Sequence, residues 1–553
     1  MRLKRFILPL LVVVALFSVR AVKSDFALVR DTEILVNMLR ALNENYVDTL
    51  STTKLLRDAT AGMSRSLDPY TSYIDESDME DFEIMTTGKY GGIGAVIRQN
   101  GDYVTISQPY KGSPADKVGL LIGDRILEID GKSAKGLTTS EVSSKLKGTP
   151  GSRVKLVVGS VIDSAERKVT IRRQRISIPA VPYYDMLDET TGYLQHTDFI
   201  EGGYEEMRTA LIDLEQRGMK SLILDYRSNG GGVMQEAIKV LSLFVPSNSE
   251  VLKIKGRRDS IIYRTEESPL LPNTPIVVLI DESSASAAEI VAGALQDMDR
   301  AVLVGQRSFG KGLVQSTVPV GYDSYLKLTT SRYYIPSGRC IQAMDYTDHS
   351  DERKVTRVAD SLRREFLTLG GRKVYDGGGV TPDVEMEADY ISRFAGTLYA
   401  QGLIEEWGEG YYREHYNEPF DARTFEISDE DFASFEAFIA TRDVKYESKA
   451  SRAISALEIA AEADRNEELS LKLKELREGI NDDVDDHMKR YRSEIEEYLK
   501  QDIILRFAYI EGVLINRVAQ DKEVARAREI LANSEEMNRL LTPREEVEST
   551  IEE

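Results

Sequence analysis

The sequence predicts a multidomain α/β protein whose central α/β core is flanked by helical segments. At 553 residues the chain is too long for a single hydrophobic core. Apolar runs typical of buried strands alternate with helical patterns over residues 173–385, which indicates the α/β core. Short strands and turns fill residues 86–172, whereas residues 25–85 and 386–553 show helical spacing of apolar residues. We therefore expect four folded parts with these boundaries.

The composition excludes several classes of function. Hydrophobic residues make up 42% of the chain, which is ample for folded domains. A net charge of −21 argues against nucleic-acid binding, because phosphates require basic surfaces. The single cysteine, Cys340, excludes an internal disulfide and a cysteine-rich zinc site. We expect an inert thiol there, and neither a metal ion nor a cofactor.

Residues 1–22 have the pattern of an export signal. Basic residues precede an apolar run of about 14 residues from Phe6 to Val19, fewer than the roughly 20 of a spanning helix. That length fits the apolar core of a signal peptide. Because the cleavage pattern near Ala21 is loose, a retained single membrane anchor is the alternative. Both interpretations imply export.

The segment 25–85 is expected to form an amphipathic helical pair. Apolar residues such as Leu28, Leu35 and Leu42 recur at helical spacing. A second helical run extends from Leu50 to Leu67 and is stopped by Asp68-Pro69. Such a pair packs against its neighbours or contributes a homodimer contact.

The segment 86–172 is expected to be α+β. A glycine-rich loop, Tyr90–Gly94, precedes the first strand, and helices open at Ser113-Pro114 and at the Thr138–Glu141 capping box. Exposed N–H groups in such a loop can hold a carboxylate while the next strand edge pairs with an extended peptide. The expected strands are Ile93–Ile97, Val104–Ser107, Arg125–Ile129 and Val154–Val158.

This segment resembles a PDZ domain, a partly open β-barrel with two helices. The resemblance rests on the glycine loop together with GSPADKVGLLIGDRILEIDGK, which runs from Gly112 to Lys132. It implies that the loop receives a protein C-terminal carboxylate and that a nearby pocket takes an apolar last side chain. By this resemblance Gly92, Ile93 and Gly94 would bind the peptide C-terminus.

The core segment opens with a strand from Gly192 to Phe199 and a helix from Tyr204 to Gln216. A buried strand, Leu222–Tyr226, then leads to the loop 227–232, which reads RSNGGG. Ligands bind α/β folds at this end of the strands, and successive glycines let the backbone approach a ligand closely.

The stretch from Ile276 to Gln315 carries the candidate chemistry. A buried strand, Ile276–Ile280, precedes a turn of small residues and a helix with one apolar face, so Ser286 falls at a helix N-terminus beside unpaired N–H groups. A strand from Ala301 to Val304 leads to Lys311 between two glycines. Serine with lysine is a known hydrolytic pairing.

Other interpretations of these residues remain open at this point. Ser286 and Glu289 fit a capping box, so the serine could simply cap its helix. Gly305–Lys311 matches the first seven positions of a P-loop, but Gly312 stands where magnesium binding needs Ser or Thr. Lys311 could also be a solvated turn residue. A histidine triad would have to use His196, which lies on a core strand.

Several motifs follow one another along the chain: GMSRSLDPYTSY, the PDZ run, LILDYRSNGGG, SSASAAEIVAGALQD, GQRSFGKGLVQ, YYIPSGR and GGGVTPDVE. In this order they resemble the C-terminal processing peptidases, serine–lysine proteases with an inserted PDZ domain. The resemblance implies that Ser286 is the nucleophile, Lys311 the general base and Gln315 the residue that orients the lysine. The N–H groups of Gly231 and Ala287 would form the oxyanion hole.

The chemistry of a lysine base sets one further expectation. A pKa near 10.4 must fall toward roughly 7–8 through desolvation before lysine can accept a serine proton at neutral pH. Phe309, Leu313 and Val314 supply apolar surroundings in the sequence. The chain departs from the family at Gly230, where proline is common, which puts the conformation of the oxyanion turn in doubt.

We thus expect an exported endopeptidase of the bacterial envelope, on the periplasmic side and either free or anchored in the inner membrane. Its partners would be proteins or peptides with apolar C-termini. The rival hypothesis is a catalytically inactive scaffold whose PDZ domain only binds protein C-termini. The helical region 386–553 carries no motif that identifies a role.

Overall fold

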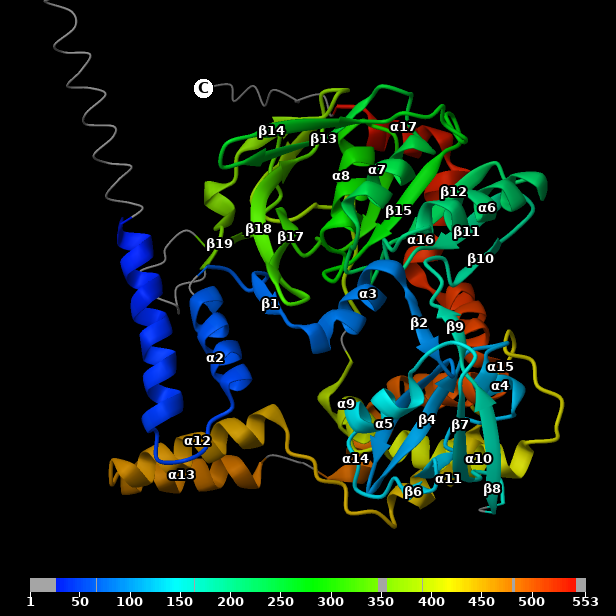
Figure 1. The fold of residues 1–553 in the computed structure, drawn as a ribbon. Coiled ribbons are helices and arrows are strands. Elements are labelled where there is room, and N and C mark those ends of the chain that lie inside the picture. The colour runs from blue at the N-terminus through cyan, green and yellow to red at the C-terminus, as the bar shows by residue number, and fades with distance from the viewer. Residues whose placement is uncertain are drawn as a thin grey trace, which may run out of the picture. The chain divides into compact units, whose positions relative to one another are not determined.

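The computed structural model describes residues 26–65, 67–163, 165–346, 356–389, 391–479 and 483–543 (Figure 1). The predicted export segment 1–22 lies outside the described residues. The chain divides into two compact units, and each is described by itself. The first unit comprises residues 1–79, 314–331 and 345–356, and the second comprises 80–313, 332–344 and 357–553.

The first unit contains the predicted helical pair, formed by residues 26–45 and α2 (Thr52–Arg65). Asp68 accepts hydrogen bonds from the N–H groups of Tyr70 and Thr71, both 2.8 Å, in the turn that follows α2. The chain then enters β1 (Ser72–Ile74), which pairs antiparallel with β18 (Ser324–Tyr334). β17 (Leu313–Gly321) pairs with β18 as well.

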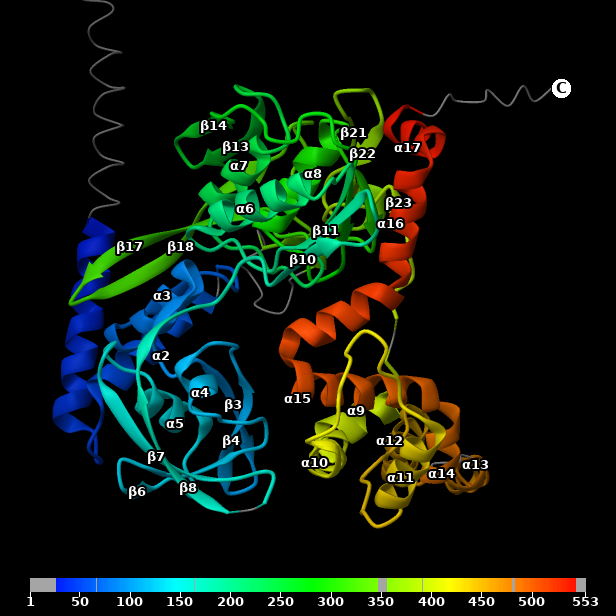
Figure 2. The same ribbon diagram turned by 90° about the vertical axis from the view of Figure 1, so that its right-hand side faces the viewer.

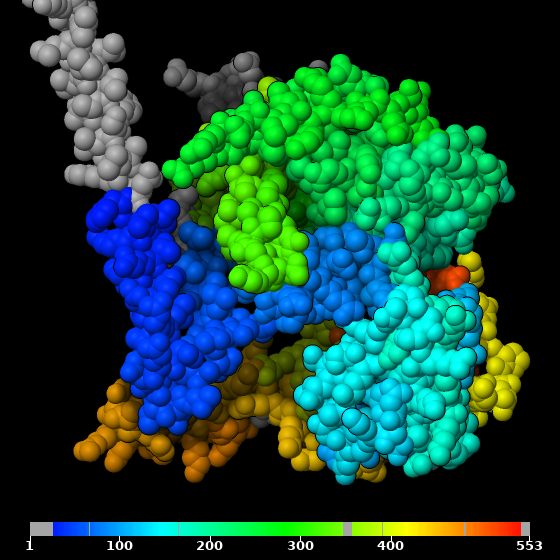
Figure 3. All heavy atoms as spheres, viewed as in Figure 1, coloured from blue at the N-terminus to red at the C-terminus, as the bar shows by residue number. Residues whose placement is uncertain are grey.

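The PDZ-like part is built on a six-stranded sheet in the order β3-β4-β5-β7-β8, with β6 paired to β5. Its apolar side chains, among them Val104, Ile126 and Leu156, form a separate core, and Figure 3 shows the segment in cyan as a compact lobe. Its elements are β3 (Ala95–Asn100), β4 (Tyr103–Pro109), α4 (Pro114–Lys117), β5 (Arg125–Ile129), β6 (Lys132–Ser133), α5 (Thr139–Leu146), β7 (Arg153–Gly159) and β8 (Glu166–Arg172).

The predicted first strand begins later than expected. Gly92 belongs to β2 (Lys89–Gly92), which pairs antiparallel with β9 (Gln174–Ser177), and the loop at Ile93 and Gly94 separates it from β3. The strands by which the chain enters and leaves the domain, β2 and β9, therefore pair with each other. Gly92, which the resemblance assigns to the peptide-binding loop, takes part in this pairing. α3 (Met79–Thr87) precedes β2.

The peptidase-like core is a six-stranded sheet in the order β10-β11-β12-β15-β16-β23. All neighbours are parallel except β10 and β11. Every residue of β12 and β15 is buried, as expected of central strands of a parallel sheet. The strands are β10 (Tyr183–Met186), β11 (Thr191–Gln195), β12 (Ser221–Asp225), β15 (Ile276–Ile280), β16 (Val302–Gly305) and β23 (Val384–Glu385).

Helices cover both faces of this sheet (Figure 2). α6 (Gly203–Gln216), α7 (Met234–Ser242) and α8 (Ala287–Asp297) lie on one side. On the other side α16 and α17 pack their apolar residues against Ile223, Val277 and Val302. Both faces of the sheet are thus covered by helices. In folds of this kind the loops at the carboxyl ends of the strands build the ligand site.

Two sequence predictions need correction in this core. The strand predicted over Gly192–Phe199 ends at Gln195, because His196–Phe199 leaves the ladder for a loop. We expected α8 to be amphipathic, whereas all of its residues, 287–297, are buried. A helix of mostly small and apolar residues is enclosed on every side when it is a central element.

The remaining chain consists of short strands and a helical region. The helices from α9 onward confirm the predicted helical C-terminal region, and α15 is kinked at Tyr509. No helix of the described ranges is long and apolar enough to cross a membrane. The other elements are η1 (Glu76–Asp78), β13 (Glu250–Gly256), β14 (Ser260–Arg264), β19 (Met344–Asp345), β20 (Thr356–Arg357), η2 (Asp360–Leu362), β21 (Glu365–Leu367), β22 (Lys373–Tyr375), α9 (Arg393–Ala400), α10 (Leu403–His415), α11 (Asp429–Ile439), α12 (Lys449–Ala463), α13 (Glu467–Glu478), α14 (Val484–Arg490), α15 (Arg492–Gln520), α16 (Lys522–Ala532) and α17 (Ser534–Leu541).

Candidate active site

Ser286 occupies a strained turn between β15 and α8. Its backbone dihedrals are φ 54° and ψ −111°, a region that residues other than glycine rarely adopt. An ordinary N-cap residue has an extended backbone instead. A strained turn from strand to helix is the geometry that exposes a serine nucleophile in the α/β-hydrolases. The backbone of Ser286 therefore has a conformation that can expose the side chain, and the residue is half-buried.

Hydrogen bonds hold the chain that leads into this turn. Asp281 accepts the N–H groups of Ser283 and Ser284, at 3.0 and 2.9 Å. The hydroxyl of Ser284 donates to the carbonyl oxygen of Tyr226 at 2.9 Å. The turn is therefore tied to the end of the neighbouring strand β12, which supports the strained conformation.

Glu289 joins the serine turn to the lysine loop. Its Oε2 accepts the N–H of Ser286 at 2.8 Å and the N–H of Lys311 at 2.9 Å. Its Oε1 accepts the hydroxyl of Ser308 at 2.5 Å and the N–H of Gly310 at 2.7 Å. Because one oxygen atom serves both residues, the backbone nitrogens of Ser286 and Lys311 lie within two hydrogen-bond lengths of each other.

The carboxyl group of Glu289 is buried, with 1% of the residue exposed. Burial raises its pKa, against the lowering effect of the four donated hydrogen bonds. The sequence predicted this glutamate only as half of a capping box. Its contacts with the lysine loop had no sequence pattern, because they join residues about 20 positions apart through the fold.

The glycines beside Lys311 are required by close packing. Gly310 has φ +89°, and a Cβ there would lie 2.3 Å from Cβ of Ala343. The N–H of Gly312 donates to Oε1 of Gln342 at 2.7 Å. These contacts fix the loop that carries the half-buried Lys311. A P-loop is disfavoured as well, because the N–H groups of Gly310 and Lys311 donate to Glu289 and a phosphate would need them.

The predicted oxyanion residues lie against the serine. A Cβ on Gly231 would be 2.8 Å from Cβ of Ser286 and 2.9 Å from the backbone nitrogen of Ala287. Gly231 has φ +100°, so glycine suits this position for conformation and for space. The loop after β12 and the N-terminus of α8 therefore meet at Ser286.

The N–H of Gly231 is engaged within its own loop. It donates to Oδ1 of Asn229 at 2.8 Å, and the buried Asn229 side chain donates to the carbonyl oxygen of His196 at 2.7 Å. The carbonyl oxygen of Gly231 accepts the N–H of Phe199 at 2.9 Å. In this conformation Gly231 could serve an oxyanion only after exchanging the bond to Asn229.

Other predicted residues near the lysine are placed as follows. Gln315 donates from its side chain to Oγ1 of Thr329 at 3.2 Å, so its role toward Lys311 stays a prediction. Leu313 is buried, whereas Phe309 is 46% exposed and does not supply the enclosed apolar surface that we expected. The sequence missed Tyr333, a buried residue whose hydroxyl donates to the carbonyl oxygen of Ser286 at 3.2 Å.

His196 does not fit the histidine-triad interpretation. His196 is fully enclosed, and neither ring nitrogen has a hydrogen-bond partner among the described residues. Burial lowers its pKa to about 3, so the ring is neutral at physiological pH. It packs edge-on against Phe199 and Tyr226. His196 is a core residue that cannot reach a substrate.

The predicted carboxylate-binding loop of the PDZ-like part is buried and tightly packed. The carbonyl oxygens of Ile93 and Gly94 accept the N–H groups of Ala115 and Tyr110, at 2.8 and 2.9 Å. Gly94 has φ +76°, and a Cβ there would lie 2.5 Å from Cβ of Ser113. β3 follows at the edge of its sheet, so one side of this strand is available to an added peptide strand.

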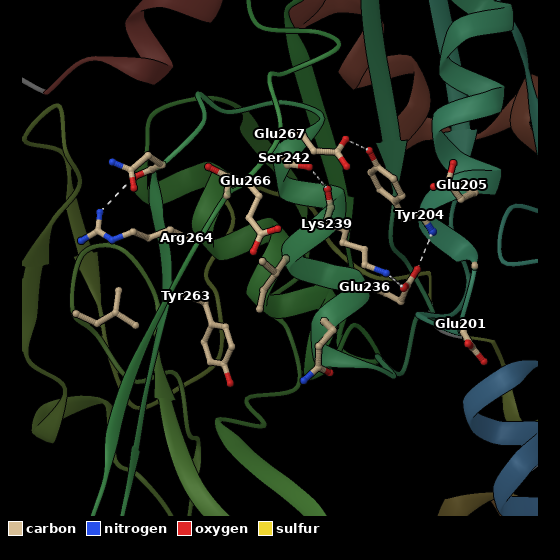
Figure 4. A pocket seen from close by; sticks show the side chains of 16 residues that line it. Glu201, Tyr204, Glu205, Glu236, Lys239, Ser242, Tyr263, Arg264, Glu266 and Glu267 are labelled. Carbon is tan, nitrogen blue, oxygen red and sulfur yellow. Dashed lines mark hydrogen bonds and ion pairs between the residues drawn. The ribbon is translucent and has the colours of Figure 1, made fainter.

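A separate pocket of about 790 Å³ lies between α6, α7 and the β13–β14 hairpin (Figure 4). Neither Ser286 nor Lys311 lines it. Within it Tyr204 donates to Glu267 at 2.6 Å and Lys239 pairs with Glu236 at 2.8 Å. Five glutamates outnumber two basic residues in the lining, so this pocket disfavours acidic ligands.

Three family models match separate parts of the chain. Residues 105–158 match a PDZ domain and residues 190–350 match peptidase family S41. Residues 394–531 match the model described as "Probable PDZ-protease, C-terminal helical domain". The last match assigns a domain type to the helical region in which the sequence motifs showed none.

Two carboxy-terminal processing proteases and one solved structure are similar to the chain. The carboxy-terminal-processing protease of Bartonella bacilliformis is 35% identical over 317 residues, which are 56% of this chain and 72% of the relative. The carboxy-terminal processing protease CtpA of Bacillus subtilis is 33% identical over 54% of this chain and 64% of its own length. The solved photosystem II D1 C-terminal processing protease is 26% identical over 65% of this chain and 93% of its own, with a TM-score of 0.35.

The matches to peptidase family S41 and to a PDZ domain, together with the related proteases, define a serine-type peptidase that carries a PDZ domain. The matched models and relatives make the family explicit. The chain belongs to the PDZ-containing C-terminal processing peptidases of peptidase family S41, which confirms the resemblance seen in the sequence.

Proposed function

We propose that the protein is an endopeptidase that uses Ser286 as nucleophile and Lys311 as general base. The observation that carries this proposal is the shared Oε2 of Glu289, which accepts the N–H groups of both residues. A base must come within hydrogen-bond reach of its nucleophile, and a common anchor for the two backbones favours that approach.

The proposed reaction uses Ser286 and Lys311 in two stages. Neutral Lys311 accepts the hydroxyl proton as Oγ of Ser286 attacks the scissile carbonyl carbon, and the developing oxyanion is stabilised by N–H groups at the start of α8. The protonated lysine then donates that proton to the leaving amine as the C–N bond breaks. In the second stage Lys311 accepts a proton from water as the water oxygen attacks the acyl carbon. It then donates that proton to Oγ of Ser286 as the ester bond breaks, which releases the acid and restores Ser286. Gln315 would orient Lys311, and Ala287 and a rearranged Gly231 would supply the oxyanion donors.

The PDZ domain would recruit substrates by their C-termini. A free carboxylate would bind the loop at Gly92, Ile93 and Gly94, and the tail would pair with the edge of β3. An apolar last side chain would enter the adjoining pocket. The substrates would be exported or envelope proteins, with the enzyme on the periplasmic side of the inner membrane, either free or held by a single anchor in residues 1–22.

The proposal is tested by digesting a denatured protein with the wild type and with Ser286→Ala and Lys311→Ala. Both variants should lose more than about a thousandfold in kcat, because removing a nucleophile or its base leaves only binding and oxyanion effects. Ser283→Ala and Lys220→Ala change exposed residues and should digest like the wild type. Wild-type digestion by Ser286→Ala would overturn the proposal. Tail-peptide binding without Ser286-dependent turnover would favour the inactive scaffold.

A further inference from the structure

The C-terminal helical region contacts the frame of the candidate active site through one arginine. β12 ends at Asp225, and Arg227 is the first residue of the loop 227–232 that carries Gly231. Its NH1 group pairs with Asp521 at 2.7 Å and with Glu523 at 2.6 Å, and its NH2 group pairs with Asp225 at 2.5 Å. Three carboxylates thus surround one guanidinium, and two of them come from almost 300 residues further along the chain.

This cluster is shielded from solvent. The Arg227 side chain is 15% exposed, and those of Asp521 and Glu523 are 8% and 7% exposed. The surrounding carboxylates raise the pKa of Arg227, against the effect of its burial. Charges in such surroundings interact strongly, and removing one partner leaves the others uncompensated.

The carboxylates are held in place by α16 itself. Asp521 is the N-cap of this helix and accepts the N–H groups of Glu523 and Val524, at 2.8 and 3.0 Å. Val524, together with Ala527, belongs to the apolar cluster that anchors α16 to the sheet. The start of α16 therefore has a fixed position relative to the strands of the core.

Glu523 reaches a second loop as well. Its Oε1 accepts the side-chain N–H of Gln306 at 2.5 Å, while its Oε2 contacts Arg227. Gln306 follows β16 and opens the loop that leads to Lys311, and its own N–H donates to the carbonyl oxygen of Ile280 at 3.0 Å. The carboxylate of Glu523 thus contacts Arg227, in the loop that carries Gly231, and Gln306, in the loop that leads to Lys311.

We propose that Asp521 and Glu523 are positioning residues for the peptidase reaction. They hold Arg227 and Gln306, and through them they set the spacing between the loop of Gly231 and the loop of Lys311. The inference rests on the proposed serine–lysine function. Its physical basis is that displacement of a catalytic group by about 1 Å costs on the order of a hundredfold in rate.

The test uses the double variant Asp521→Asn with Glu523→Gln in the full-length chain. Asparagine keeps an oxygen for the helix cap and glutamine keeps the side-chain size, so the charge changes while α16 is retained. Glu529→Gln removes an exposed carboxylate of the same helix and is the matched control. Steady-state kinetics on an unfolded protein, thermal unfolding and binding of a fluorescent C-terminal peptide are measured for each.

We expect kcat of the double variant to fall roughly tenfold or more, with KM within about twofold, because the loops lose alignment rather than substrate contacts. Thermal unfolding should show a folded protein at the assay temperature, peptide binding should be unchanged, and Glu529→Gln should match the wild type. A kcat within twofold of the wild type would overturn the positioning role. Loss of activity that only tracks loss of folded protein would also overturn it.

Ser286→Ala measured in parallel separates this inference from the proposed function. If Ser286→Ala retains activity, the serine–lysine proposal fails. If Ser286→Ala is inactive while the double variant behaves like the wild type, only the positioning role of Asp521 and Glu523 fails.

Discussion

At the scale of single residues, a buried glutamate holds the two candidate reacting residues together. Glu289 accepts four hydrogen bonds, two on each carboxylate oxygen, and the residue is almost completely buried. The hydroxyl of Ser308 and the N–H of Gly310 are buried and would lose this partner if the carboxylate were lost. We therefore expect this residue to affect both stability and catalysis, since the same bonds shape the serine turn and the lysine loop.

Replacing Glu289 with glutamine tests this dual role. The amide presents N–H donors where backbone N–H groups already point, so up to two bonds are lost at about 1–3 kcal/mol for each unpaired donor. We expect a lower free energy of unfolding in urea and a lower kcat. Glu282→Gln, an exposed change in the preceding turn, should alter neither quantity. Wild-type stability and rate in Glu289→Gln would contradict the structural role.

His196 makes a pH prediction with a definite sign. Its pKa is about 3 in the folded protein and about 6.5 when unfolded, so between these values the unfolded chain binds the extra proton. Stability contributed by neutral His196 is therefore lost as pH falls below about 6.5, by up to about 1.4 kcal/mol per pH unit. His196→Gln should show a shallower loss of unfolding free energy with acid and should keep its peptidase activity. Equal pH slopes in the two proteins would disprove the assignment.

At the scale of elements, the helix of residues 26–45 carries apolar side chains that the described residues of its own unit leave exposed. Leu28, Ile34 and Met38 are 69%, 58% and 53% exposed. Exposed apolar side chains of this kind can mark interaction sites. The homodimer contact through a helical region stays a prediction.

Replacing Leu28, Ile34 and Met38 together with serine should shift the protein from dimer to monomer. The physical reason is the loss of apolar area that a second copy would bury. The measurement is molar mass by light scattering across a range of protein concentrations. A monomeric wild type, or an unchanged mass in the triple variant, would contradict the dimer.

Elements with strong local patterns were predictable from the sequence. β15 coincides with the predicted Ile276–Ile280 strand because a continuous apolar run between Pro275 and Asp281 leaves little choice. The capping box at Thr138 also starts its helix as expected, since both of its hydrogen bonds are local. Patterns that depend on neighbours in sequence survive into the fold.

Contacts between distant segments were not predictable. No sequence pattern indicates that β2 pairs with β9, so the resemblance assigns Gly92 to the binding loop alone. The link from Glu289 to the lysine loop and that from Tyr333 to Ser286 arise only when strands and loops assemble. Motif order predicted Ser286 and Lys311 as candidates, whereas the residues that contact their backbones required the structure.

At the scale of the whole molecule, three matched regions share one chain and the helical one is part of the peptidase frame. α16 and α17 cover a face of the central sheet, and Asp521 and Glu523 reach the loops beside the candidate site. The C-terminal helices, whose sequence carries no motif that identifies a role, thus contribute both apolar packing and buried ion pairs.

The central claim is that Ser286 is a nucleophile activated by Lys311. It is tested most directly by mass spectrometry of the intact protein after reaction with a serine-directed phosphonate at neutral pH. The wild type should gain one adduct, located on Ser286, whereas Ser286→Ala should gain none and Lys311→Ala should react far more slowly. An adduct on Ser286→Ala, or equal labelling rates for Lys311→Ala and the wild type, would contradict the claim.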